Sequence, residues 1–154
     1  NTYAGNHRDF IWPTDRSYIS SFYGWRPDPA ERIWDKRLLR MGFHSGIDIP
    51  GITGEPVYAV ADGIVTLSDS LKSAGEAICI KHDNGIYSVY YHLYERMVNN
   101  DDFVYQGQII GFLGSSGFST GPHLHFGVYN SKWKSLNPLD YLPGKKRLAY
   151  QSYQ

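Results

Sequence analysis

Apolar residues alternate with polar or small ones along most of the chain from Phe43 onward, and this period of two is typical of β-strands. The segments that we expect to form strands are residues 17–25, 55–60, 64–67, 77–82 and 86–91. The last two flank Asp83-Asn84-Gly85, whose Asn-Gly pair favours a tight hairpin turn. Val104–Gly111 loosely repeats Val57–Ile64, a weak hint of an internal duplication. The pattern predicts a mainly β fold built from antiparallel strands.

Ala30–Met41 is the one segment with helical spacing, because Ile33, Trp34, Leu38 and Met41 fall near one face. The pattern favours a surface insertion that packs this face on the core over an element that gates a substrate. Residues 1–16 are mostly polar, and we expect an N-terminal arm there, a β domain over residues 17–142, and a C-terminal tail over residues 143–154. Neither the arm nor the tail has a role that the pattern supports.

Composition limits the classes of protein to consider. A chain of 154 residues with 42% hydrophobic and 19% charged residues fits one globular domain. Lys+Arg and Asp+Glu both number 15, so no net field favours nucleic acid or an anionic membrane, and we expect no nucleic-acid partner. No apolar run approaches the roughly 20 residues that span a bilayer. The start shows no signal-peptide pattern, so we expect any targeting, anchoring or regulatory segment to lie outside this chain.

Three short motifs contain four of the six histidines and one well-placed aspartate: His44-Ser45-Gly46-Ile47-Asp48, Tyr91-His92-Leu93 and His123-Leu124-His125. Two imidazoles and one carboxylate are a common ligand set of catalytic zinc, with a fourth position left for water. A structural zinc site would more often use cysteine, and the single cysteine, Cys79, lies in an apolar run typical of a buried residue. The motifs therefore indicate metal-assisted hydrolysis.

The spacing within the motifs sets geometric conditions. In a straight strand the Cα atoms of His44 and Asp48 would lie about 13 Å apart, too far for one ion, so the chain must bend, and Gly46 allows the bend. Taken alone, the pair also fits a surface histidine and a turn aspartate. In a strand His123 and His125 share one face, with Leu124 facing the core. The spacing leaves open whether both bind metal or one faces the substrate.

The remaining histidines have plainer interpretations. His92 is expected to end a strand, and in isolation it fits a hydrogen-bonded histidine beneath tyrosines. His82 precedes a turn and is expected to make a structural hydrogen bond, and His7 is given no role. The chain lacks His-Glu-x-x-His, the helical zinc motif whose glutamate is the general base, so the base must come from elsewhere. Histidines outside the ligand set are the best candidates.

The ordered motifs resemble those of the lysostaphin-type zinc metallopeptidases of bacterial cell walls, a family with a duplicated-hybrid-motif β fold. The resemblance covers about residues 17–142. It is carried by Phe22-Tyr23-Gly24-Trp25-Arg26, His44-Ser45-Gly46-Ile47-Asp48, Gly54-Glu55-Pro56-Val57-Tyr58-Ala59, His82-Asp83-Asn84-Gly85, Tyr91-His92-Leu93, Gly107-Gln108-Ile109-Ile110-Gly111, Gly114-Ser115-Ser116-Gly117 and Ser119-Thr120-Gly121-Pro122-His123-Leu124-His125-Phe126. It implies an antiparallel, sandwich- or barrel-like fold with few short helices.

The resemblance also implies the division of roles. It makes His44, Asp48 and His125 the zinc ligands, and His92 and His123 the catalytic pair, without saying which of the pair is the base. It implies an endopeptidase that cuts stem peptides or cross-bridges of peptidoglycan, outside the cytoplasm. The alternative is a catalytically silent relative that acts as a scaffold or regulator of the cell envelope. Such relatives typically lose metal or catalytic residues, and this chain keeps all five. A third interpretation, a sugar- or peptide-binding β module, accounts for the aromatic residues but not for the ordered motifs.

The chain departs from the family pattern in three loops. The stretch between Arg26 and His44 looks longer than usual, residues 71–76 lack the usual glycine-rich pattern, and residues 99–102 replace a glycine-bearing turn. We expect these changes to affect substrate choice, since none removes a ligand or catalytic candidate.

Overall fold

The computed structural model describes residues 10–25 and 43–144. Within these ranges the fold is mainly antiparallel β, as predicted. The elements are β1 (Gly24–Trp25), β2 (Phe43–His44), β3 (Ile47–Pro50), β4 (Pro56–Tyr58), β5 (Gly63–Leu71), β6 (Gly75–Lys81), β7 (Tyr87–Arg96), β8 (Phe103–Val104), β9 (Ile109–Leu113), β10 (His123–Tyr129), β11 (Ser135–Leu136) and the 3₁₀ helix η3 (Pro138–Asp140). No helix within the described residues has the length and apolar character that crossing a membrane requires.

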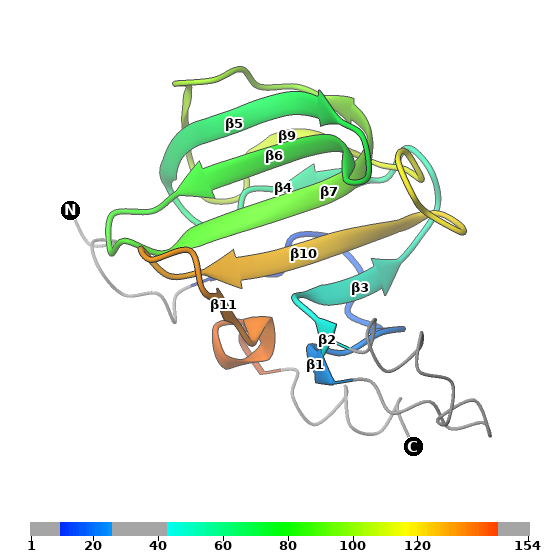
Figure 1. Cartoon of the computed structure of the whole chain (residues 1–154). Helices are drawn as coiled ribbons and strands as arrows, with labels where there is room; N and C mark the ends of the chain where they lie inside the picture. The colour runs from blue at the N-terminus through cyan, green and yellow to red at the C-terminus, as the bar shows by residue number, and fades with distance from the viewer. Residues whose placement is uncertain (1–9, 26–42, 145–154) are drawn as a thin grey trace.

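One large sheet organises the fold. Its strand order is β11-β10-β7-β6-β5-β8, β3 adds to β10, and β9 joins β7 to β4 (Figure 1). The described strands do not close into a barrel, so of the expected architecture the antiparallel β class is what the structure confirms. β4 pairs with β9 and β5 pairs with β8, a reciprocal arrangement that accords with the weak repeat in the sequence.

Some element boundaries differ from the prediction. Only Gly24–Trp25 of the expected strand over residues 17–25 is regular, and Ser21 adds a single bridge to Asp48. The segment has only the two-residue strand β2 and a single bridge to β3 to pair with, which leaves most of it outside a regular ladder. β7 continues to Arg96, so His92 lies inside a strand and not at its end. The expected helix Ala30–Met41 and His7 lie outside the described residues.

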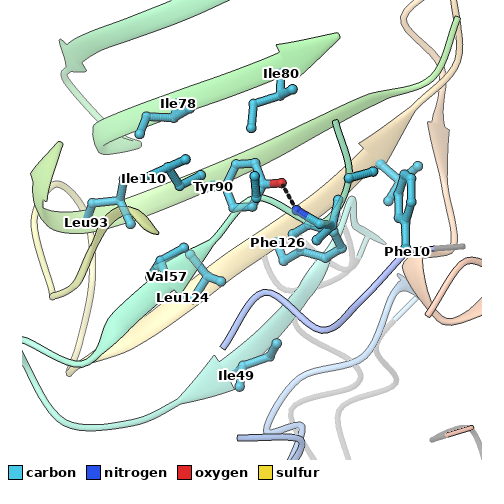
Figure 2. Close-up of a cluster of buried hydrophobic side chains, with 14 of the residues drawn as sticks. Phe10, Ile49, Val57, Ile78, Ile80, Tyr90, Leu93, Ile110, Leu124 and Phe126 are labelled. Carbon is cyan, nitrogen blue, oxygen red and sulfur yellow. Dashed lines mark hydrogen bonds between the residues drawn. The ribbon is translucent and has the colours of Figure 1, made fainter. Parts of the chain in front are cut away.

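A hydrophobic core packs against one face of the sheet, and side chains of β6, β7 and β10 contribute to it (Figure 2). Its largest fully buried side chains include Tyr90, Phe126 and Leu124. Phe10 is only 1% exposed and joins this core, although the sequence placed it in an arm outside the domain. The N-terminal segment is therefore part of the packed domain from Phe10 onward, and Trp12 Nε1 donates to the carbonyl of Pro143 near the other end.

The hairpin between β6 and β7 has the predicted turn. The backbone N–H of His82 donates to the carbonyl of Ile86 at 2.9 Å, and that of Gly85 donates to the carbonyl of His82 at 3.1 Å. Gly85 has φ +80°, a left-handed conformation that glycine adopts without a steric penalty. The hairpin turn predicted from the Asn-Gly pair is therefore present in the structure.

A chain of buried hydrogen bonds runs from this hairpin into the core. His82 Nδ1 donates to the carbonyl of Asp62 at 2.7 Å, which leaves Nε2 to accept from Ser88 Oγ at 2.9 Å. Ser88 Oγ lies 2.8 Å from the Tyr90 hydroxyl, whose oxygen accepts from the backbone N–H of Val60 (Figure 2). Burial lowers the pKa of His82 to about 4, so the ring is neutral at pH 7. His82 therefore has the structural role expected of it.

Candidate metal centre

Three side chains from two of the sequence motifs converge on one point. His44 Nε2 lies 3.3 Å from Asp48 Oδ1 and 3.2 Å from His125 Nδ1, and His125 Nδ1 lies 3.3 Å from Asp48 Oδ1. Among the described residues this is the group of His, Cys, Asp and Glu side chains that could hold a metal ion. These are the residues that the sequence nominated as ligands.

The backbone brings them together in the expected way. Asp48 and His125 lie opposite each other in the antiparallel pair β3–β10. His44 reaches them from β2 because the chain bends at Ser45-Gly46, as the spacing required. Gly46 lies against the imidazole of His125, since a Cβ added there would lie 2.8 Å from Nε2 of that ring. Glycine at this position lets the bend pack tightly on the ligand candidate.

Hydrogen bonds and burial set protonation states that suit a metal. His44 Nδ1 lies 3.1 Å from the carbonyl of Phe22, which only accepts, so Nδ1 carries the proton and Nε2 presents a lone pair to the cluster. Burial lowers the pKa of His125 despite the nearby carboxylate of Asp48. Burial alone would raise the pKa of Asp48, but the neighbouring imidazoles of His125 and His44 hold it well below its usual range. An imidazole nitrogen with a free lone pair and an ionised carboxylate are the forms in which these side chains bind a metal.

The spacing of the three atoms also fits zinc. Bonds of about 2.0–2.1 Å in a tetrahedral arrangement place neighbouring ligand atoms roughly 3.3–3.4 Å apart. The observed separations of 3.2, 3.3 and 3.3 Å match this edge length. Nε2 of His125 is buried without a hydrogen-bond partner among the described residues, so Nδ1, in the cluster, is the ring nitrogen with a polar environment. The donor set and its dimensions therefore fit a zinc ion.

His92 and His123 lie beside this cluster. His123 Nε2 is 3.7 Å from Asp48 Oδ1, and the ring centroids of His92 and His123 are 4.9 Å apart. His123 and His125 share a face of β10 while Leu124 is fully buried, as predicted from alternation. All five residues that the sequence nominated are thus in one place.

An irregularity in β7 aims His92 at the cluster. Tyr87–Tyr91 pair with β10, whereas Leu93–Arg96 pair with β9, so the partner strand changes at His92. His92 has φ +68°, which is uncommon for a residue other than glycine, and its N–H donates to the carbonyl of Ala74 at 2.8 Å. Such strained residues concentrate at functional sites. Its pKa is lowered, because burial outweighs the hydrogen bond to the carbonyl of Ser116.

One loop, residues 114–122 between β9 and β10, orients both of these histidines. The carbonyl of Ser116 lies 2.7 Å from His92 Nδ1, and the carbonyl of Gly121 lies 2.8 Å from His123 Nδ1. Because carbonyls only accept, each ring carries its proton on Nδ1 and keeps a lone pair on Nε2. This gives each ring a basic nitrogen away from the loop.

Serine side chains hold this loop in place. Ser116 Oγ donates to the carbonyl of Leu93 at 2.5 Å and accepts from the N–H of Glu76 at 3.0 Å, which anchors it to β6 and β7. Ser119 Oγ lies 3.2 Å from His123 Nδ1 and donates to the carbonyl of Gly121 at 2.8 Å. The sequence pattern did not indicate a role for these serines. Their only signal was a Ser/Gly-rich stretch directly before a histidine pair.

Comparison with known proteins identifies the family. Residues 42–138 match the sequence profile described as Peptidase family M23. The chain belongs to Peptidase family M23. It is 40% identical over 116 residues to the DD-carboxypeptidase/endopeptidase Mpg of Neisseria meningitidis, a match that covers 75% of this chain and 25% of that protein. It is 37% identical over 133 residues to the murein hydrolase activator NlpD of Salmonella dublin, covering 86% of this chain and 31% of that protein.

Solved M23 structures share the fold. The catalytic domain of lysostaphin from Staphylococcus simulans aligns with a TM-score of 0.68 and 28% identity, over 83% of this chain and 91% of that domain. A structure described as a zinc-containing peptidase from Vibrio cholerae aligns with a TM-score of 0.70 and 30% identity, over 87% of this chain and 39% of that one. The resemblance to lysostaphin-type zinc peptidases is thereby confirmed, while this chain spans only a quarter to a third of the curated relatives above.

A tyrosine of the M23 domain completes the surroundings of the cluster. The ring of Tyr91 stacks on that of His125, with centroids 5.2 Å apart and an interplanar angle of 9°. Burial raises the pKa of Tyr91 to about 12, so it stays neutral. Cys79, as expected, is buried, at 4% exposed, and burial raises the pKa of its thiol, which favours the protonated form.

Proposed function

We propose that this chain is a zinc-dependent endopeptidase that hydrolyses peptide bonds in the stem peptides or cross-bridges of peptidoglycan. The observation that carries the proposal is the triangle of His44 Nε2, Asp48 Oδ1 and His125 Nδ1, with two further imidazoles beside it. Membership of Peptidase family M23 and the name of a Vibrio cholerae relative, peptidoglycan DD-endopeptidase ShyC, support the substrate class.

In this proposal His44, Asp48 and His125 hold the ion. When bound, zinc supplies a Lewis acid that polarises the scissile carbonyl and makes a water molecule more acidic. The protein's part is to present three ligand atoms at tetrahedral spacing, with Asp48 ionised and His125 neutral. No described carboxylate other than that of Asp48 lies in the cluster, so a different side chain type must move the proton.

His92 and His123 are the residues we assign to proton transfer. Because Nδ1 of each ring donates to a loop carbonyl, Nε2 is the nitrogen that accepts a proton from the attacking water. The protonated ring then donates to the leaving amine as the peptide bond breaks. Fixed Nδ1–H···O=C bonds hold each ring in one tautomer, and this preorganisation favours the transfer.

The substrate sets where the protein works. Peptidoglycan lies in the bacterial cell envelope, so we place the activity outside the cytoplasm, in agreement with relatives named for acting on that polymer. The partner we propose is the peptide portion of peptidoglycan.

A second candidate function is regulation without catalysis. The similarity to a murein hydrolase activator over 86% of this chain favours it. The complete set of five histidine and aspartate side chains in one cluster favours the enzyme. An activator would need only the surface of the domain, and nothing in that role requires neutral imidazoles at tetrahedral spacing.

The experiment has two readouts, metal content and bond cleavage. We expect about one zinc per chain by elemental analysis, and much less in His44→Ala or Asp48→Ala. His123→Ala should keep most of the zinc yet release no fragments from purified peptidoglycan, as followed by mass spectrometry of muropeptides. Ser131→Ala, on an exposed turn away from the cluster, is the matched control and should behave as wild type.

The same assay separates the two functions. Wild-type protein with full zinc that leaves peptidoglycan of varied cross-bridge chemistry uncut would refute the endopeptidase. If that inactive protein then accelerates a separate murein hydrolase, the activator function replaces it. The masses of released fragments also identify the bond that is cut.

A further inference from the structure

A surface cavity of about 520 Å³ lies at the end of β3, the strand that carries Asp48. This volume is within the usual range of roughly 300–1,000 Å³ for ligand sites. Its lining residues come from the N-terminal segment and from the end of β3: Arg16, Ser17, Tyr18, Pro50, Gly51 and Ile52. We call this cavity the Arg16 pocket. The mechanism proposed above does not use it.

Strand register places the Arg16 pocket on the same face as the metal cluster. Pro50 lies opposite His123 in the β3–β10 pair, and it shares a face with Asp48 because Ile49 between them is fully buried. The N–H of Gly51 donates to the carbonyl of Pro122, beside His123. The pocket therefore continues the candidate site on its His123 side.

The other wall is the N-terminal segment, which runs beside β3. The N–H of Ser20 donates to the carbonyl of Asp48 at 3.0 Å. Ile19 is 2% exposed and faces the core, whereas Tyr18 is 56% exposed and lines the pocket. With Ile52, 63% exposed, Tyr18 gives the pocket apolar walls against which the aliphatic parts of a peptide can pack.

Arg16 is held in a fixed orientation at this pocket. Its Nε and Nη2 donate to the two carboxylate oxygens of Glu55 at 2.8 and 2.7 Å. Glu55 Oε1 also accepts from the N–H of Ile52 at 2.9 Å. A Cβ on Gly51 would lie 2.6 Å from Glu55 Oε1, so only glycine leaves room for the pair. The guanidinium is thus preorganised and does not have to be ordered by a ligand.

The ion pair uses only one edge of the guanidinium. Five N–H groups are available, and Glu55 takes one from Nε and one from Nη2. The remaining three, on Nη1 and Nη2, have no bonded partner among the described residues, and the Arg16 side chain is 44% exposed. That second edge can take another carboxylate in a bidentate, charge-assisted pair, on a different side of the group from Glu55.

We propose that the Arg16 pocket is a substrate subsite that binds a free carboxylate of the peptide. The inference rests on the proposed function and names a chemical group that the substrate carries. Gly51, against which Arg16 packs, is three residues from Asp48, about 10 Å along an extended strand. For a peptide that runs alongside β3, at about 3.3–3.6 Å per residue, this spacing corresponds to a carboxylate about three residues from the scissile bond. A leaving group of one residue would not reach, which favours internal bonds.

The test compares two synthetic stem peptides that differ only in a carboxylate or a carboxamide, three residues from the scissile bond, placed on each side in turn. We expect wild-type protein to prefer the carboxylate at least about 10-fold in kcat/KM, the scale of a hydrogen bond between charged groups. Arg16→Gln should abolish this preference by raising KM for the carboxylate peptide, with kcat unchanged. The carboxamide peptide should change less than about 2-fold, because it makes no charge-assisted pair.

Arg96→Gln is the matched control. Arg96 also pairs with a glutamate, Glu76, at 2.7 Å, but on strands away from the pocket, and its loss should leave the preference intact. The proposal is overturned if wild type does not discriminate, if Arg16→Gln affects both peptides equally, or if Arg96→Gln has the same effect. Calorimetric binding of both peptides to the zinc-loaded His123→Ala variant decides the subsite even if wild type cuts neither peptide. In that case only the proposed enzymatic function fails.

Discussion

Acidification should destabilise this protein through His82. Its pKa is lowered to about 4 by burial, whereas an unfolded histidine titrates near 6.5. As pH falls below about 6.5 the unfolded chain takes up a proton that the folded chain refuses until about pH 4. Stability contributed by the neutral ring is therefore complete above pH 6.5 and is lost between 6.5 and 4.

The size of the effect follows from the shift. A difference of about 2.5 pH units at 1.36 kcal/mol per unit gives about 3 kcal/mol. This is a large share of the roughly 5–15 kcal/mol that stabilises a typical domain. Burial explains the resistance to protonation, because it disfavours the charged ring and outweighs the hydrogen bond to the carbonyl of Asp62, which acts in the opposite direction.

The assay is urea unfolding at several pH values between 7 and 4, with a chelator present so that metal release does not contribute. His82→Gln cannot titrate but keeps a donor and an acceptor. The other histidines titrate in both proteins, so their contributions to the pH dependence of the unfolding free energy cancel when the two proteins are compared. We expect wild type to lose about 3 kcal/mol more than the variant over this range. A proton NMR titration of wild type should show a His82 ring that stays neutral down to about pH 4.

Equal pH slopes for wild type and His82→Gln would refute the reasoning. So would a His82 resonance that titrates near 6.5, since burial would then not have lowered its pKa.

Two further predictions concern the site. Gly46→Ala should weaken zinc binding, measured by chelator competition, and destabilise the fold by about 1–3 kcal/mol, because its Cβ would lie 2.8 Å from Nε2 of His125. Gly121→Ala, whose Cβ meets nothing within 4 Å, is the control, and equal losses in both would contradict the steric argument. Ser119→Ala should lower kcat about 5-fold with KM and zinc content unchanged, since His123 Nδ1 loses one acceptor, and Ser119→Thr should restore it. A change in KM alone, or no rescue by threonine, would show that Ser119 does not position the ring.

Much of the candidate site could be predicted because its geometry follows from strand periodicity. Alternation placed His123 and His125 on one face with Leu124 in the core, and the structure agrees. The distance between His44 and Asp48 required a bend, which occurs at Ser45-Gly46. In both cases local backbone rules decide where a side chain points.

Other features of the site depend on which strands pair with each other in the sheet, and strand pairing cannot be read from a single sequence. His92 lies in the middle of β7, where the partner strand changes from β10 to β9, so its left-handed backbone could not be anticipated from its neighbours. The loop that orients His92 and His123 acts through backbone carbonyls, which every residue has. The burial of Phe10 could not be predicted from the sequence, because one apolar residue in a polar stretch gives no periodic pattern.

The loop between β9 and β10 has a consequence for engineering. Since the carbonyls of Ser116 and Gly121 serve two different rings, an insertion or deletion between these positions would misalign both histidines at once. Retargeting the domain to another bond should therefore leave this loop untouched. The Arg16 pocket does not use this loop, so changes at Tyr18 or Ile52, which line the pocket, would leave both histidines in place.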